Sequence, residues 1–168
     1  MRQYIDIIAE VSRNKEKRRA AVRSQPTLSE PERPIIGGVS FFVCKKELSK
    51  TLNNYLPLKD QLKDKITVFM TVKKDSPDAM FTKTDAPFSR TANIWPKNVF
   101  HAHLTGNISL VYGKEGMTIK LFGVYTHDDL GIGAGKGGRQ PKQQAHAAAY
   151  RVATWTPFNK PEFDAFEQ

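Results

Sequence analysis

The stretch that decides the fold is VFHAHLTGNISLVYGKEGMTIKLFGVYTHDDLG, residues 99–131. Three runs within it alternate or cluster apolar residues in the way expected of short β-strands: residues 99–104, 108–112 and 117–125. The segments TGN (105–107) and GKEG (113–116) between them are typical of tight turns, in which glycine accepts a positive φ. The pattern therefore predicts an antiparallel meander over residues 99–125.

The meander also gathers three of the four histidines of the chain. His101 and His103 are two residues apart, so on a strand both side chains project from the same face. Phe100, Ala102 and Leu104 share the opposite face. His127 follows the third strand, where the meander returns the chain to the same neighbourhood, so we expect the three imidazoles to lie close together.

The rest of the chain predicts further helices and strands around this meander. Apolar runs and helical spacing indicate the following elements: a strand over 38–44, a helix over 45–56, a strand over 66–72 and a helix over 140–155. The fold class is therefore α+β, with a small antiparallel sheet of four or five strands packed against the helix 45–56 and the helix 140–155.

Composition divides the chain into three parts. Residues 1–34 combine a short amphipathic, strongly basic helical segment with a proline-rich linker, SQPTLSEPERP. Residues 35–156 are expected to form a single domain, and residues 157–168 an acidic and aromatic tail.

The chain has 168 residues, a net charge of +9 and a pI near 9.7. Such a charge favours anionic partners such as nucleic acid, the ribosome or an acidic protein, although a merely soluble basic surface would have the same composition. Cys44 is the only cysteine, which excludes an intramolecular disulfide and a cysteine-based metal site and suits the cytoplasm. No apolar run approaches the length of a membrane span, so no membrane contact is expected.

Histidine side chains exchange protons near neutral pH, which suits acid–base catalysis close to phosphate. RNA cleavage needs one group to take the proton of the 2′-hydroxyl and another to protonate the leaving 5′-oxygen. His101, His103 and His127 could supply both. Two alternatives remain open: ordinary hydrogen-bonded strand histidines, or a zinc or iron site with Asp128 or Asp129 as carboxylate ligands.

Basic residues with aromatic neighbours mark the long polar segment 73–98, a pattern that suits single-stranded RNA. These are Lys73, Lys74, Lys83, Arg90 and Lys97, with Phe81, Phe88 and Trp95. Arg90 and Lys97 are candidate phosphate contacts, whereas Phe88 and Trp95 could instead anchor the segment to the core.

The segment GIGAGKGGRQ (131–140) is rich in glycine and follows the third of these histidines. It lacks the P-loop pattern, because Gly137 follows Lys136 where Ser or Thr is needed. Lys136 and Arg139 are instead candidates for non-specific contacts with RNA phosphates, unless the segment is a plain linker.

Three short motifs of the meander resemble the RelE/YafQ superfamily of mRNA interferase toxins, most of all its YafQ-type branch. They are Ala102-His103, Ile108-Ser109-Leu110-Val111-Tyr112 and Thr126-His127-Asp128-Asp129-Leu130. Two positions depart from the pattern of that branch: Asn107 stands near its turn aspartate, and Gly131 replaces an aromatic residue.

The resemblance implies a RelE-like fold and a ribosome-dependent endoribonuclease of a type II toxin–antitoxin system. It implies that His103 and His127 act in metal-independent cleavage of mRNA, and we expect His101 to share the proton transfer. The implied partners are mRNA, the ribosome and an antitoxin protein, with no cofactor. The alternatives are a catalytically silent RNA- or ribosome-binding module and a histidine-ligated metalloprotein.

Overall fold

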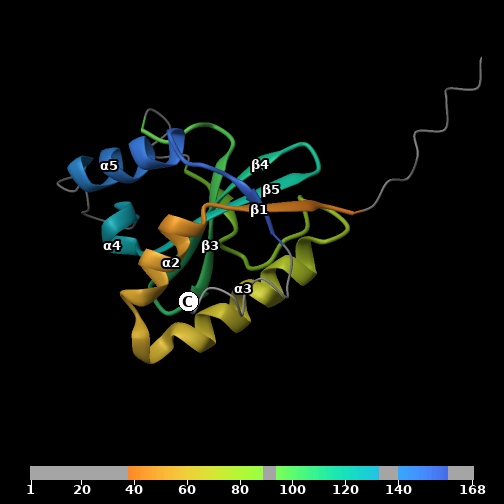
Figure 1. The fold of residues 1–168 in the computed structure, drawn as a ribbon, viewed down its shortest axis with the longest axis horizontal. Coiled ribbons are helices and arrows are strands. Elements are labelled where there is room, and N and C mark those ends of the chain that lie inside the picture. Colours follow the sequence, from red (N-terminus) through yellow and green to blue (C-terminus); the bar gives the residue numbers. More distant parts are fainter. Residues whose placement is uncertain (1–37, 89–93, 133–139, 159–168) are drawn as a thin grey trace, which may run out of the picture. The chain divides into compact units, whose positions relative to one another are not determined.

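A computed structural model describes residues 38–88, 94–132 and 140–158 of the chain (Figure 1). The chain divides into two units, Met1–Gly37 and Gly38–Gln168, and all the described residues belong to the second. The basic arm and linker predicted over 1–34 lie outside the described residues. No helix within the described part is long and apolar enough to cross a lipid bilayer.

The elements follow one another along the chain in an order that mixes helices and strands. They are β1 (Ser40–Val43), α2 (Lys45–Asn53), η1 (Leu56–Leu58), α3 (Lys59–Lys73), β2 (Ala86–Pro87), β3 (Val99–Thr105), β4 (Ile108–Glu115), β5 (Thr118–Thr126), α4 (His127–Leu130), α5 (Gln140–Arg151) and β6 (Thr156–Pro157). The α+β class predicted from the sequence is confirmed, as are the meander and the helices that begin at residues 45 and 140.

The strands form one sheet of six in the order β2-β3-β4-β5-β1-β6. The meander β3-β4-β5 is antiparallel and forms its centre. Strand β1 then pairs in parallel with β5, and this pair makes the sheet mixed rather than wholly antiparallel. The two outer strands, β2 and β6, have only two residues each. With them the sheet has six strands, more than the four or five predicted.

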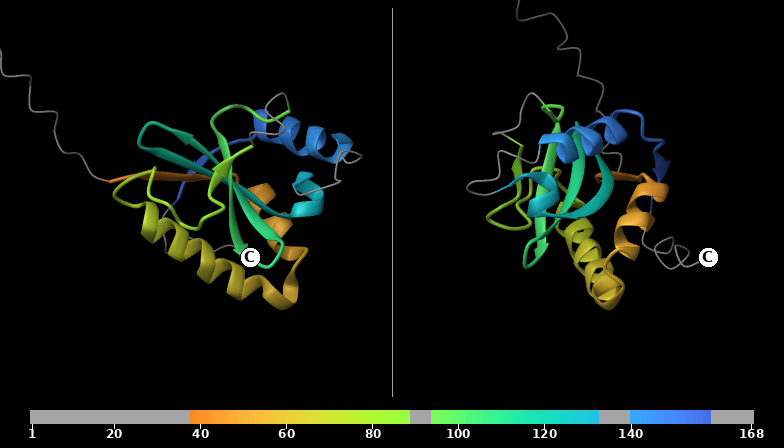
Figure 2. Two further views of the ribbon diagram at one scale, coloured as in Figure 1. Left: turned by 180° about the vertical axis from the view of Figure 1, so that it is seen from behind. Right: turned by 90° about the vertical axis from the view of Figure 1, so that its left-hand side faces the viewer.

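Helices cover both faces of the sheet, as the two further views show (Figure 2). On one face, apolar side chains of α2 and α3, among them Leu48 and Ile66, pack against Ala102, Leu110 and Leu121 of the meander. On the other face, α5 packs through its apolar side chains on a second cluster that includes residues of β3, β4 and β5. Strand alternation therefore gives the sheet two separate cores.

The strand predicted over residues 66–72 is wrong, because this segment belongs to the helix α3. Thr67 and Thr71, which suggested a strand by their β-branched alternation, donate their hydroxyls to the carbonyls four residues earlier. The buried side chains of α3 recur at three or four residues: Leu62, Ile66, Phe69 and Lys73. Burial at the helical period therefore overrides the strand propensity of this segment.

Two predicted boundaries of the sheet also shift. The turn expected over 113–116 lies later, because β4 continues to Glu115 and the left-handed residue is Gly116, with a φ of 57°. Gly113 is instead a strand residue that faces the Tyr150 hydroxyl of α5, where a Cβ would collide. At the other end, β6 pairs with β1, and Phe158 is buried in the core, so the first two residues of the expected tail belong to the folded unit.

The segment 73–98 is held against the domain at both of its ends. Trp95 is 1% exposed and stacks on Phe88 with 4.7 Å between ring centroids, which supports the interpretation of both as anchors. Lys73, which we expected among the cations available to RNA, is instead buried in an ion pair with Asp85. Residues 89–93 of the segment lie outside the described part of the chain.

Candidate active site

The register of the β3-β4 hairpin places the strand histidines on one face of the sheet. His103 lies opposite Ser109, and His101 lies opposite Val111. Directly opposed residues of an antiparallel pair project to the same side, which here is the side covered by α5. The predicted common face of the two histidines is therefore confirmed.

The first residue of α4 brings the third histidine to the same place. The backbone N–H of His127 donates to the carbonyl of Asn107 at 2.8 Å, which ties the start of this helix to the β3-β4 turn. The Thr126 hydroxyl caps the helix by accepting from the N–H of Asp129. At the other end Gly131 has a φ of 63°, and a Cβ there would collide with Gln143 of α5.

The three imidazoles form a row in which one pair is close. The ring centroids of His103 and His127 are 4.2 Å apart, and those of His101 and His103 are 6.0 Å apart. His127 Nε2 lies 3.2 Å from the Oγ of Ser109, whose side chain is buried. The hydroxyl of Ser109 therefore orients the imidazole of His127, and His127 faces His103.

Burial makes the protonation of His101 differ from that of the close pair, His103 and His127. His101 is 9% exposed and packs against Phe88, with 4.9 Å between ring centroids. Removal from water, with the nearby imidazoles of His103 and His127, lowers its pKa to about 4. His101 is therefore uncharged at neutral pH, and its buried ring packs on Phe88.

The His103–His127 pair suits proton exchange. Partial burial, and then the charge of His127, lowers the pKa of His103 from its ordinary value, so the neutral form that accepts a proton prevails at neutral pH. A positive charge on one ring disfavours a positive charge on the other. In the form with one proton between them, one ring is a base and the other is an acid.

We expect the substitution His101→Phe to reduce the loss of stability at acid pH. The wild-type imidazole has a folded pKa of about 4 against about 6.5 in the unfolded chain, so acid protonates the unfolded state first. The contribution of the neutral His101 to the free energy of unfolding is fully present above about pH 6.5. It decreases as the pH falls towards 4, by about 3 kcal/mol in total. Urea denaturation at pH 7 and at about pH 4.5 measures the difference.

His103, His127 and Asp85, whose charges act on His101, are unchanged in that variant, so the comparison with the wild type isolates one imidazole. Between the two pH values, the free energy of unfolding of the variant should fall by roughly 2–3 kcal/mol less than that of the wild type. An equal loss in both proteins would contradict the depressed pKa of His101.

The metal-site alternative receives no support from this geometry. Among the described residues, no group of three or more His, Cys, Asp and Glu side chains is arranged to hold a metal ion. Asp129, one of the predicted carboxylate ligands, instead accepts from Lys142 at 3.0 Å and from Thr126 at 2.8 Å.

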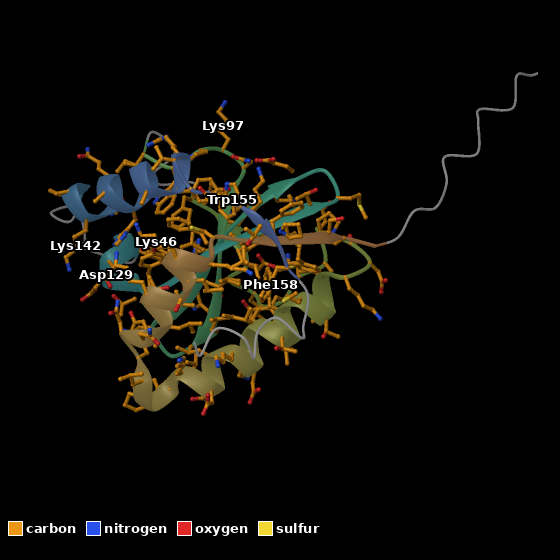
Figure 3. All side chains as sticks on the ribbon, in the orientation of Figure 1. Lys46, Lys97, Asp129, Lys142, Trp155 and Phe158 are labelled. Carbon is orange, nitrogen blue, oxygen red and sulfur yellow. The ribbon has the colours of Figure 1, made fainter. Side chains whose placement is uncertain are left out.

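Of the predicted phosphate contacts, Lys97 alone is among the described residues, and it is not brought to the histidine pair. Lys97 is exposed and precedes β3, whereas His103 lies four strand residues beyond the first residue of β3, or roughly 13 Å along the strand. Figure 3 shows its side chain directed away from the domain. Arg90, Lys136 and Arg139 lie outside the described residues.

Two residues that sequence reasoning missed are important to the site. The sequence predicts Ser109 only as a strand residue, and counting across the two-residue turn Gly106-Asn107 would place Leu110 opposite His103. A shift of register between His103 and Thr105 brings Ser109 to that position instead. His146, the fourth histidine, lies on α5 with its ring 4.4 Å from that of Tyr125. Tyr125 in turn lies opposite Ser109, so all four histidines belong to one face of the sheet.

Comparison with known proteins adds no further assignment. No model of a known protein family matches the chain, and no curated protein matches it in sequence.

Proposed function

We propose that this protein is a metal-independent endoribonuclease that resembles the ribosome-dependent mRNA interferase toxins and acts on mRNA in the cytoplasm. The observation that carries the proposal is the His103–His127 pair, with 4.2 Å between ring centroids and with His127 oriented by Ser109. The basic charge of the chain and the resemblance of residues 99–131 to the RelE/YafQ superfamily add support.

The two imidazoles are suited to the two proton transfers of RNA cleavage. One ring removes the proton of the 2′-hydroxyl, and the 2′-oxygen then attacks the adjacent phosphorus. The bond from phosphorus to the 5′-oxygen breaks, and the other ring protonates that leaving oxygen. The products are a 2′,3′-cyclic phosphate and a 5′-hydroxyl end. His101, which is neutral and buried, would support the position of His103.

Primer extension on messages recovered from a cell-free translation reaction tests the proposal. Adding the protein should create new ends within translated regions, and the upstream fragments should end in a 2′,3′-cyclic phosphate. A message with a 2′-deoxynucleotide at a mapped cleavage position should remain intact there, because the attacking oxygen is missing.

The same reaction without ribosomes distinguishes ribosome-dependent cleavage from cleavage of free RNA. Intact messages in every reaction would overturn the proposal. Binding of RNA or ribosomes without cleavage would instead identify a catalytically silent binding module.

A further inference from the structure

A groove of about 550 Å³ lies between α3 and the edge of the sheet that β1 and β6 form. Phe41 of β1, Met70 of α3 and Phe158, the residue after β6, line it with apolar side chains. All three belong to the core on the α3 side of the sheet or pack against it, whereas the histidines lie on the α5 side. The groove is therefore separate from the proposed catalytic site.

The walls of this groove are partly open to solvent. Phe41 and Met70 are only half-buried, and Pro157 of β6 is exposed. The α3 wall runs from Thr67 to Lys74 with lining residues three or four positions apart, which places them on one side of the helix. Seven residues of a helix rise by about 10 Å. The groove therefore presents an apolar surface about 10 Å long that the described part of the chain leaves uncovered.

The backbone pairing around the groove gives the direction in which the chain leaves β6. The N–H of Phe158 donates to the carbonyl of Phe41 at 2.9 Å, which extends the antiparallel pairing of β6 with β1. The N–H of Val39 donates to the carbonyl of Lys74 at 2.7 Å, where β1 begins beside the end of α3. At Phe158 the chain is therefore directed along the groove, from Phe41 towards Val39 and Lys74.

Residues 159–168, which follow Phe158, have a composition that suits this groove. Their sequence is NKPEFDAFEQ. It contains two aromatic rings and three carboxylates, those of Phe163, Phe166, Glu162, Asp164 and Glu167. Five extended residues span up to about 16 Å, so Phe163 can reach the whole length of a groove that is about 10 Å long.

Charge favours this segment over the basic end of the chain as the occupant. Lys74 lines the groove, and its side chain is 63% exposed. Lys63 lies one turn before Thr67 on the same side of α3. The carboxylates that follow Phe158 are attracted by these ammonium groups, whereas the strongly basic residues 14–23 are repelled by them.

The covalent connection favours the same chain over a second copy. Residues 159–168 are joined to Phe158, which itself lines the groove. A short tether of this kind gives an effective concentration on the order of millimolar. A second copy in dilute solution does not reach that concentration.

We propose that residues 159–168 dock in the groove between α3 and β1 of their own chain, with the two phenylalanine rings on its apolar walls and the carboxylates beside Lys74. The docked segment covers the α3 side of the sheet and leaves the histidine face open. This inference does not depend on the proposed ribonuclease function.

Urea denaturation of the full-length protein tests whether the two rings are buried. Phe163→Ser with Phe166→Ser should raise the equilibrium constant for unfolding by about tenfold or more, the usual effect of burying one phenylalanine side chain. The matched control is Met80→Ser with Val152→Ser, which removes apolar side chains that are 67% and 83% exposed. The control should change the constant little, and equal effects of the two double variants would overturn the inference.

Charge reversal on the α3 wall tests where the segment docks. Thr71→Glu with Lys74→Glu places negative charge at two exposed positions that line the groove, so it should repel the acidic segment. In this background the two phenylalanine substitutions should have little further effect, because substitutions of residues in contact are not additive.

A second pair of substitutions on α3 controls for the change of charge. Gln61→Glu with Lys65→Glu alters the net charge by the same amount at two exposed positions outside the groove. The phenylalanine substitutions should keep their full effect in this background. A full effect in both backgrounds would show that the rings are buried elsewhere and would overturn the inference.

Protein concentration distinguishes docking within one chain from docking between two copies. Docking within one chain leaves the urea midpoint unchanged over about a hundredfold range of concentration. A midpoint that rises with concentration in the wild type, but not in the phenylalanine variant, would place the segment in the groove of a second copy and overturn the inference.

Discussion

Replacing His103 or His127 with alanine should lower the rate of RNA cleavage by roughly 10²–10⁴-fold, the usual contribution of one acid–base group. Each substitution removes one of the two rings whose centroids are 4.2 Å apart, so the remaining ring lacks its partner for proton exchange. Primer extension of translated messages measures the rate. Expression of either variant should no longer inhibit growth.

The two histidines should also behave as one unit. The double variant should lose little more activity than either single variant, because residues that act together in one step have strongly non-additive effects. Lys65→Ala on the exposed side of α3 serves as the control and should cleave at the wild-type rate. Circular dichroism confirms that the histidine variants remain folded. Cleavage and toxicity equal to those of the wild type in both single variants would refute the catalytic assignment.

Local patterns were sufficient to predict the sheet that carries this pair. The meander was predictable because strand alternation is visible over each run and because short turns permit only an antiparallel return. The common face of His101 and His103 followed from the two-residue period alone. The approach of His127 followed from the topology, since the third strand of a meander ends near the turn between the first two.

Sequence reasoning failed where long-range burial decides the structure. Residues 66–72 have the composition of a strand, but the surface against which Phe69 packs belongs to β4 and to the segment after α3. The approach of His146 to Tyr125 depends likewise on the placement of α5 over β5. No local pattern predicts contacts between residues so far apart in the chain.

The buried contacts of Lys73 are a further case that sequence could not predict, and they carry the second large expected effect. Lys73 Nζ lies 2.6 Å from Asp85 Oδ2, and both side chains are 3% exposed. The Tyr112 hydroxyl donates to the other carboxylate oxygen, and the N–H of Phe81 donates to Oδ2 at 3.1 Å. Burial and the Asp85 carboxylate raise the pKa of Tyr112, so its hydroxyl remains protonated. Residues from α3, the following segment and β4 thus converge on one carboxylate.

The contacts around Asp85 also determine where the edge of the histidine site lies. Asp85 immediately precedes β2, whose Ala86 pairs with His101 of β3. Lys73 Nζ additionally donates to the carbonyl of Pro77 at 3.2 Å, which fixes the start of the same segment. Holding residues 77–85 against α3 and β4 therefore keeps β2 and Phe88 on His101.

Asp85→Ala should lower the free energy of unfolding by about 3–5 kcal/mol, because it leaves the Lys73 ammonium buried without its counter-charge. The control is Asp75→Ala, since Asp75 pairs with Lys74 at 3.9 Å but its side chain is 82% exposed. An exposed pair of this kind contributes about 0–1 kcal/mol. Guanidinium denaturation at neutral pH measures both variants.

The double variant Lys73→Met, Asp85→Ala separates the burial of a lone charge from the loss of contacts. Removing both charges should restore part of the stability lost in Asp85→Ala, because no uncompensated ion remains in the core. The Tyr112 hydroxyl and the Phe81 N–H lose their acceptor in either case, so recovery should be incomplete. If Asp85→Ala cost no more than Asp75→Ala, the ion pair would contribute no more to folding than a surface pair. The arrangement of β2 against His101 would then need another cause.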